Sequence, residues 1–146
     1  MTTLNNFAAI AGPELGLVIV STRRADGSIQ ASLVNAGVLP HPLTGEPAVG
    51  FVTYGPIKLA NLRARPVLAV TARSGWNWAT VEGKAILTGP DDPVDSVDPE
   101  RLRRLLRDVF TAAGGTHDDF GAYDRVMAEE RRVAVLVTPA RISPRG

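Results

Sequence analysis

The sequence predicts a mainly β, α+β fold in which six antiparallel strands form a small closed or nearly closed barrel with helices packed outside it. Six stretches have strand character, and most connections between them are too short for a parallel crossover. One stretch, residues 78–89, exceeds normal strand length, and Gly83 at its middle marks a bulge or a bend at a barrel corner. With 146 residues and 45% hydrophobic composition, the chain fits a single domain, 1–146, that buries its own core.

The first third of the chain predicts a short helix and a β-hairpin. Residues 3–10 are expected to be helical, ending near Gly12 and Pro13. The apolar run LGLVIVST, residues 15–22, predicts a strand buried on both faces. Asp26-Gly27 is typical of a tight hairpin turn. In the strand that follows, Ile29, Ala31 and Leu33 alternate with Gln30, Ser32 and Val34, which places the two sets on opposite faces.

A long loop and three more elements are expected in the middle of the chain. Residues 36–47 are rich in Gly and Pro and predict a loop, and residues 48–54 predict the third strand. Pro56 suits the first position of a short helix over 57–65, which Pro66 ends. Residues 67–72 and 78–89 are the fourth and fifth strands.

Two amphipathic helices are expected before the last strand. Asp98-Pro99 provides an N-cap and a first-turn proline. Apolar residues then follow helical spacing up to Gly114-Gly115: Leu102, Leu105, Leu106, Val109 and Phe110. Phe120, Tyr123 and Met127 have the same spacing in a second helix, and residues 132–142 predict the sixth strand.

Composition excludes several classes of function. Cysteine is absent, which excludes disulfides and thiolate metal sites, and His41 and His117 are too few and too far apart to suggest a metal site or a histidine-based triad. The net charge of +1 is dispersed along the chain, which argues against nucleic acid as a partner. No run has the length of a membrane span, and the N-terminus lacks the basic region of a secretory signal. We therefore expect a cytoplasmic protein with no membrane contact.

Lys58 is placed where a helix disfavours a cation. It falls in the first turn of the helix after Pro56, where the helix dipole adds partial positive charge. Fourteen of the sixteen basic residues are arginines, so a lysine here stands out. One interpretation is a solvated surface lysine. The other is an anion site, because a helix N-terminus after a strand commonly binds phosphate or carboxylate, and Lys58 would add a full charge.

Other candidate residues have structural interpretations as well. Arg23 and Arg24 fit solvated charge beside the hairpin, or contacts to an anionic tail. Trp76 and Trp78 fit packing at the barrel mouth or a subunit interface, or stacking on a flat ligand. Ser32, Thr53 and Tyr54 fit ordinary sheet positions, and His117 fits a polar helix entry. We find no catalytic nucleophile, metal ligand set or acid–base pair, which is compatible with an enzyme whose bound redox cofactor carries the hydride.

Four stretches together resemble the flavin/deazaflavin oxidoreductases that have the pyridoxamine-phosphate-oxidase-like, FMN-binding split barrel. They are STRRADGSIQASLV, GFVTYGPIKLANLRARP, WATVEGKAIL and RVAVLVTPARI, in the order and spacing of that family. The sequence looks most like the short actinobacterial branch that uses coenzyme F420, a deazaflavin with a phosphate and a polyglutamate tail. The resemblance implies a homodimer with the cofactor in a groove between the subunits.

The resemblance also implies roles for individual residues. Lys58 would contact the cofactor phosphate or acidic tail, with Asn61 one turn further. Ser32, Val34, Thr53 and Tyr54 would line the ring and ribityl region, and Trp78 would lie near the ring or the interface. Many relatives have an arginine two residues before the lysine, where this chain has Pro56. Arg23, Arg24 or Arg63 would then have to compensate.

Three functions remain open on this basis. The first is a reductase that depends on reduced F420 and passes a hydride to a small conjugated or electron-poor substrate. The second keeps the fold and uses FMN. The third is a dimeric carrier, without catalysis, for a flavin, deazaflavin or tetrapyrrole. A dimer that binds no cofactor is the remaining alternative.

Overall fold

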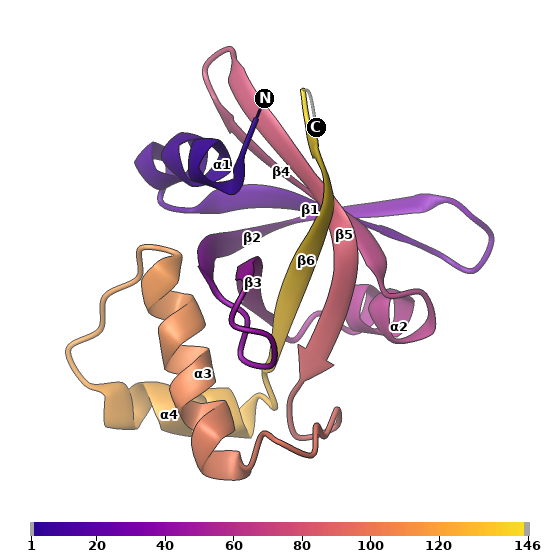
Figure 1. Ribbon diagram of the computed structural model, residues 1–146. Helices are drawn as coiled ribbons and strands as arrows, with labels where there is room; N and C mark the ends of the chain where they lie inside the picture. Colours follow the sequence, from indigo (N-terminus) through magenta and orange to yellow (C-terminus); the bar gives the residue numbers. More distant parts are fainter. Residues whose placement is uncertain (1, 145–146) are drawn as a thin grey trace.

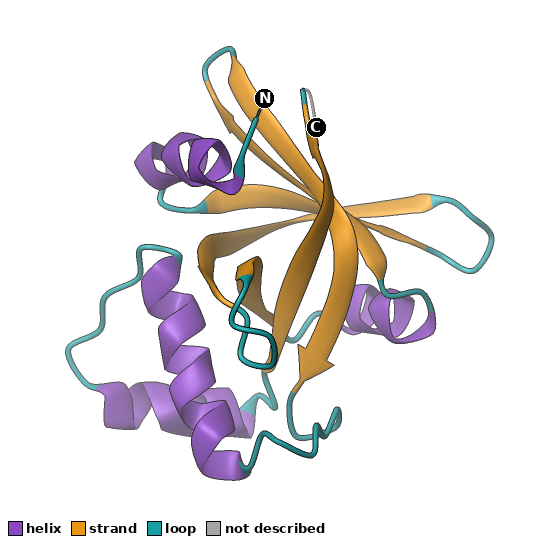
Figure 2. Ribbon diagram, in the orientation of Figure 1, coloured by secondary structure: helices purple, strands orange, loops and turns teal. Residues whose placement is uncertain are grey.

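Six antiparallel strands close into one barrel, as predicted (Figures 1 and 2). The computed structural model describes residues 2–144. The strands are β1 (Leu17–Arg23), β2 (Ile29–Pro40), β3 (Pro47–Thr53), β4 (Val67–Ser74), β5 (Asn77–Thr88) and β6 (Val133–Ser143). Their order around the barrel is β1-β2-β3-β6-β5-β4, and each neighbouring pair is antiparallel. The predicted hairpin between β1 and β2 is confirmed, with Gly27 in its turn at a φ of 86°.

The helices lie outside the barrel. They are α1 (Leu4–Ala11), the short 3₁₀ helix η1 (Gly12–Glu14), α2 (Pro56–Ala64), α3 (Pro99–Ala112) and α4 (Phe120–Glu129). Figure 2 shows α3 and α4 together on one side of the barrel, with α1 and α2 apart from them. Asp98 caps α3 as predicted, because its carboxylate accepts a hydrogen bond from the Arg101 N–H. Within residues 2–144, no helix has the length and apolar character needed to cross a bilayer.

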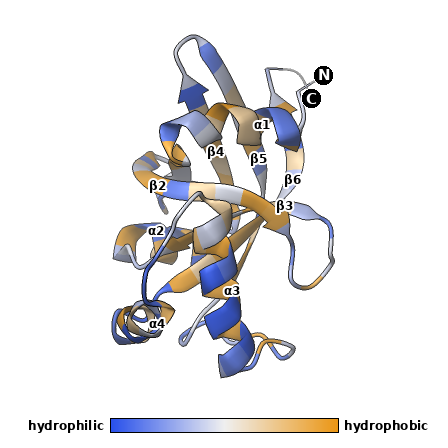
Figure 3. Ribbon diagram, turned by 90° about the vertical axis from the view of Figure 1, so that its left-hand side faces the viewer, coloured by the Kyte–Doolittle hydropathy of each residue, from blue (hydrophilic) through white to orange (hydrophobic). Residues whose placement is uncertain are grey.

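α3 is held by one apolar face and one charged face. Leu105, Leu106 and Val109 are buried against the barrel. On the other face, Arg107 forms an ion pair with Asp124 of α4. Hydrophobic and strongly hydrophilic residues therefore both occur along the α3 ribbon in Figure 3. This packing places the end of α3 and one side of α4 beside β2 and β3, where the candidate site lies.

Gly83 marks a bulge in the long strand β5, as predicted. The register between β5 and β6 shifts between Glu82 and Gly83. A Cβ atom at Gly83 would lie 2.0 Å from the Thr138 carbonyl oxygen, so any side chain would displace the β6 backbone. The glycine allows the two strands to approach and β5 to bend around the barrel.

Two sequence predictions were wrong. β1 is buried on one face only, since Val18 and Val20 are buried while Leu17 and Ile19 are 38% and 41% exposed. Residues 36–40, predicted as part of a loop, continue β2. Gly37, one of the residues that suggested a loop, is instead a point of close packing between β2 and α3. A Cβ atom at Gly37 would lie 2.2 Å from the Ala112 carbonyl oxygen, so Gly37 lets α3 approach the strand.

Candidate functional site

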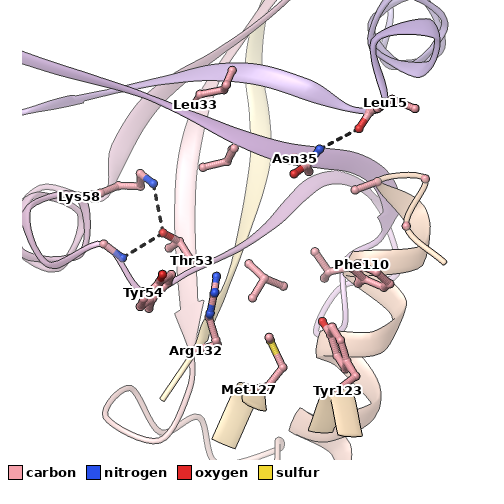
Figure 4. A pocket seen from close by; sticks show the side chains of 17 residues that line it. Leu15, Leu33, Asn35, Thr53, Tyr54, Lys58, Phe110, Tyr123, Met127 and Arg132 are labelled. Atoms are coloured by element: carbon pink, nitrogen blue, oxygen red, sulfur yellow. Dashed lines mark hydrogen bonds between the residues drawn. The ribbon is translucent and has the colours of Figure 1, made fainter. Parts of the chain in front are cut away.

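Lys58 is buried at the N-terminus of α2. β3 ends at Thr53, and α2 begins at Pro56 in the first helical position, as predicted. The Lys58 side chain is 6% exposed, which excludes the interpretation as a solvated surface lysine. Its Nζ donates a hydrogen bond of 3.1 Å to the Thr53 Oγ1 (Figure 4). The same oxygen accepts the Gly55 N–H at 3.3 Å, so Thr53 fixes both the turn and the ammonium group.

No negative charge within the described residues 2–144 compensates Lys58. The ion pairs of this part of the chain all involve arginines. Burial lowers the pKa of Lys58, and the positive charge of Arg132 lowers it further. A buried cation without a counter-ion is costly to maintain. A bound anion would remove this cost.

Lys58 faces a cavity of about 620 Å³. β2, β3, α2 and the α3–α4 region all contribute to its wall (Figure 4). The polar side contains Thr53, Lys58 and Arg132, and the opposite side is apolar and aromatic. The full lining is Leu15, Leu33, Val34, Asn35, Val52, Thr53, Tyr54, Gly55, Lys58, Val109, Phe110, Ala113, Gly114, Gly115, Tyr123, Met127 and Arg132. A molecule with an anionic group at one end and a flat apolar part at the other matches this distribution.

Arg132 is a second cation of the cavity that the sequence did not indicate. Its guanidinium carbon lies 3.6 Å from the centre of the Tyr54 ring, which is a close cation–π stack. Nη2 donates to Glu130 at 3.2 Å, while the buried Nε has no hydrogen-bond partner. In the sequence, Arg132 looks like its neighbour Arg131, which pairs with Asp91 away from the cavity. Only the position of Arg132 directly before β6, beside the end of β3, distinguishes the two.

The structure brings four of the predicted cofactor-binding residues to the cavity: Val34, Thr53, Tyr54 and Lys58. Ser32, Asn61 and Trp78 do not line it. Asn61 is buried and donates to the Thr22 Oγ1 at 3.1 Å, so it ties α2 to β1. The Ser32 hydroxyl is buried with no hydrogen-bond partner. Trp78 is 46% exposed on β5.

The arginines expected to compensate for Pro56 lie elsewhere. Arg63 binds both carboxylate oxygens of Asp92, at 2.9 and 2.7 Å. Arg24 donates to the Ile29 carbonyl at 2.9 Å, and Arg23 is exposed beside it. None of the three lines the cavity, whereas Arg132 does. In this chain the second positive charge of the cavity therefore comes from Arg132, the residue directly before β6, and not from α2 or the hairpin.

Trp76 and His117 both lie outside the lining of the cavity. Trp76 is 99% exposed in the turn between β4 and β5, so it does not cover the barrel mouth of its own chain. His117 lies at the entry to α4, as expected, where its Nδ1 accepts the Asp119 N–H at 3.0 Å.

Solved structures with the same architecture identify the fold. A conserved hypothetical protein, Rv2991, from Mycobacterium tuberculosis aligns over 97% of this chain and 83% of its own, with a TM-score of 0.67 and 19% identity. A putative pyridoxamine 5'-phosphate oxidase from Listeria innocua aligns over 95% of this chain and 94% of its own, with a TM-score of 0.54 and 14% identity. The chain has the split-barrel fold. The fold that the resemblance in the sequence implied is therefore confirmed.

Another split barrel among these structures is described as an F420 reductase. It aligns over 87% of this chain and 88% of its own, with a TM-score of 0.57 and 19% identity. No protein-family model matches the chain. At 14–19% identity these structures show the fold alone.

Proposed function

We propose that this split barrel is a reductase that depends on reduced coenzyme F420. The observation that carries the proposal is the buried ammonium group of Lys58, which has no carboxylate partner among residues 2–144 and faces a cavity of about 620 Å³. A similar structure described as an F420 reductase supports the choice of cofactor.

The residues of the cavity fit such a cofactor. Lys58 and Arg132 would hold its phosphate or acidic tail, and the N-terminus of α2 adds to the positive potential. Val34, Thr53 and Tyr54 would contact the linker and ring, against the apolar wall formed by Phe110 and Tyr123. When bound, F420 would supply the hydride for an electron-poor, conjugated small molecule. The chain's part is to bind, orient and exclude water.

The proton for such a reduction would come from solvent or from the substrate. Tyr123 contributes one of the hydroxyl groups of the cavity wall, and this hydroxyl donates to the Leu106 carbonyl at 2.9 Å. Burial raises its pKa to about 12, so it keeps its proton at neutral pH. Its role is to tie α4 to α3 and to shape the wall.

The oligomer we propose is a homodimer formed through the outer apolar face, defined as Leu17, Ile19, Ala31 and Leu33 on β1 and β2. Ile19 pairs with Leu33 in the sheet, and the two are 41% and 60% exposed. Leu33 also lines the cavity, so a second copy seated on this face would reach the rim of the site. A cofactor bound there would lie beside both subunits.

A binding titration tests the cofactor assignment. F420 is added to the protein and its fluorescence is followed, and the same titration is then made with FMN. Lys58→Ala should weaken F420 binding by at least about 1.5 kcal/mol, the scale of a charge-assisted hydrogen bond. Lys84→Ala is the matched control, because Lys84 is the other lysine of the chain and is exposed on β5. An unchanged dissociation constant in Lys58→Ala contradicts the assignment.

The same measurements separate the alternatives. Tight binding of FMN with weak binding of F420 would favour the FMN-dependent oxidoreductase. Binding of either cofactor, or of a tetrapyrrole, without turnover of a set of quinone, enone and nitroaromatic acceptors would favour a carrier. Oxidation of reduced F420 by any of these acceptors, lost in Lys58→Ala and retained in Lys84→Ala, would support the reductase.

A further inference from the structure

Helix α4 ends in a turn that places a carboxylate beside one cation of the main cavity. The Arg131 N–H donates to the Ala128 carbonyl at 3.2 Å and the Arg132 N–H to the Met127 carbonyl at 3.0 Å, which is the Schellman pattern. Arg131 has a left-handed φ of 49° in this turn, where glycine is the usual residue. Across the turn, the Glu130 Oε1 accepts a hydrogen bond of 3.2 Å from the Arg132 Nη2. The turn therefore keeps the carboxylate next to the guanidinium.

The ion pair between Arg132 and Glu130 differs from the other ion pairs of residues 2–144. It alone among them includes a cation that lines the main cavity. The Arg132 and Glu130 side chains are 22% and 32% exposed, so the pair is screened less by water and salt than a fully exposed pair. Glu130 therefore reduces the positive charge that Arg132 presents to the cavity.

The main cavity is left with a single net positive charge. Two cations line it, Lys58 and Arg132 (Figure 4), and Glu130 offsets the second of them. The part of its lining that the structure describes contains no aspartate or glutamate. The positive charge of Arg132 lowers the pKa of Lys58, so the fields of the two cations overlap. An anion beside Lys58 therefore meets one uncompensated positive charge rather than two.

Arg132 keeps hydrogen-bond donors although its charge is offset. Nη2 donates to Glu130, and the buried Nε has no partner among residues 2–144. For a bound ion, the cost of leaving water rises with the square of its charge, whereas its attraction to a fixed charge rises only in proportion to it. A singly charged group therefore matches the cavity. A doubly charged group would bury a second negative charge without a partner.

We propose that Glu130 determines which anion the main cavity accepts: a singly charged phosphodiester or carboxylate in preference to a doubly charged phosphate monoester. Glu130 does not line the cavity, and it acts through the charge of Arg132. The preference belongs to the anion site itself. Its bearing on the cofactor rests on the proposed function, because the phosphate of F420 is a diester and that of FMN is a monoester.

Two small ligands that differ by one charge measure this preference. Phenyl phosphate and its methyl ester, methyl phenyl phosphate, have the same ring, and at about pH 8 the monoester is doubly charged because its second pKa is about 6. Each is titrated into the full chain by isothermal calorimetry at low salt, without F420. The wild-type chain should bind the methyl ester at least as tightly as phenyl phosphate.

Three variants assign the preference to Glu130. Glu130→Gln should strengthen binding of phenyl phosphate relative to the methyl ester at least about fivefold, because the cavity gains one positive charge. A purely structural effect would change both affinities alike, and the different sizes of the ligands cancel in the comparison. Glu129→Gln removes the same charge at the neighbouring exposed position and should leave the ratio unchanged. Lys58→Ala should weaken both ligands, which places them in the main cavity.

The proposal is overturned if the wild-type chain prefers phenyl phosphate, if neither ligand binds, or if Glu130→Gln changes both affinities equally. Binding of both ligands that is unchanged in Lys58→Ala would place them outside the main cavity and overturns it too. The F420 titration gives a separate answer for the proposed function. A ratio that changes in Glu130→Gln in a chain that does not bind F420 contradicts only the cofactor assignment, and tight F420 binding with an unchanged ratio contradicts only the role of Glu130.

Discussion

Lys58 stores unfavourable electrostatic energy in the folded chain. It is buried, its pKa is lowered by burial and by Arg132, and its one hydrogen-bond partner is the neutral Thr53 hydroxyl. Replacing it by a similar apolar side chain should therefore increase stability at the expense of anion binding. We expect Lys58→Met to raise the free energy of unfolding by about 1 kcal/mol at neutral pH, measured by urea denaturation. Lys84→Met, at an exposed position, should leave it unchanged.

The pH dependence of the same variant follows from the sign of the pKa shift. The folded chain holds the Lys58 proton less tightly than the unfolded chain, whose lysine has the ordinary pKa of 10.5. As pH rises from the lowered folded value toward 10.5, the unfolded state binds more protons, and the stability of the wild-type chain rises. The advantage of Lys58→Met should shrink over this window. An advantage that stays constant up to the ordinary lysine pKa would contradict the unpaired charge.

Tyr54 should act on anion binding through Arg132. The 3.6 Å stack holds the guanidinium at the cavity, so its loss should release the arginine. We expect Tyr54→Leu to weaken binding of inorganic phosphate by about 1 kcal/mol, measured by ³¹P NMR, and Tyr54→Phe to retain it. Phosphate has no ring to touch Tyr54 directly. Equal phosphate affinity in Tyr54→Leu and the wild-type chain would show that Arg132 is positioned by other contacts.

At the scale of the elements, Gly83 and Gly12 test how much the absence of a side chain matters, because one position is crowded and the other is open. A Cβ atom at Gly83 would meet the β6 backbone at 2.0 Å, while Gly12, at the end of α1, has no atom within 4 Å of that position and has a helical φ of −53°. Gly83→Ala should cost more than about 2 kcal/mol of stability because the β5–β6 bulge must open. Gly12→Ala should be neutral or stabilising by about 0.5 kcal/mol, through the unfolded state. Thermal denaturation of both variants measures the difference. Equal effects would show that the bulge can relax.

The elements of the fold were largely predictable because their signals are local. Asp98 and Pro99 begin α3, Asp26-Gly27 makes the hairpin turn, and Gly83 marks the bulge, all as the sequence indicated. The extent of β2 was not predictable. Gly37 is needed there because the backbone of α3 packs closely against it, and α3 lies far along the chain. The burial of β1 was overestimated for a similar reason. Sequence shows an apolar side chain but not whether another element covers it.

The candidate site was predictable in part for the same reason. Lys58 was found from a local conflict, a cation at a helix N-terminus, and Thr53 and Tyr54 are its neighbours in sequence. Arg132 is close to Tyr54 only because β3 and β6 pair, so no local signal separates it from Arg131. The smaller cavity of about 230 Å³ between α3 and α4 was not visible in the sequence either, because its apolar residues have the spacing of ordinary core positions in two amphipathic helices.

At the scale of the whole molecule, the outer apolar face explains why the LGLVIVST run looked buried on both sides. Leu17, Ile19 and Leu33 are exposed on a face that no other element within residues 2–144 covers. A second copy would supply the missing cover. We therefore expect Ile19→Arg, at the centre of this face, to convert a dimer into a monomer in sedimentation velocity, because it would bury an unpaired charge in the interface. Val126→Arg, at an exposed apolar position on α4, should remain dimeric.

The dimer prediction and the cofactor prediction then become linked through Leu33, which belongs to the outer apolar face and to the wall of the cavity. If the partner completes the site, Ile19→Arg should lose F420 affinity together with the dimer, although Ile19 itself does not line the cavity. Lys58→Ala should lose affinity and remain a dimer. A monomeric Ile19→Arg that binds F420 as tightly as the wild-type chain would show that one chain forms the whole site. A dimeric Ile19→Arg would place the interface on another face.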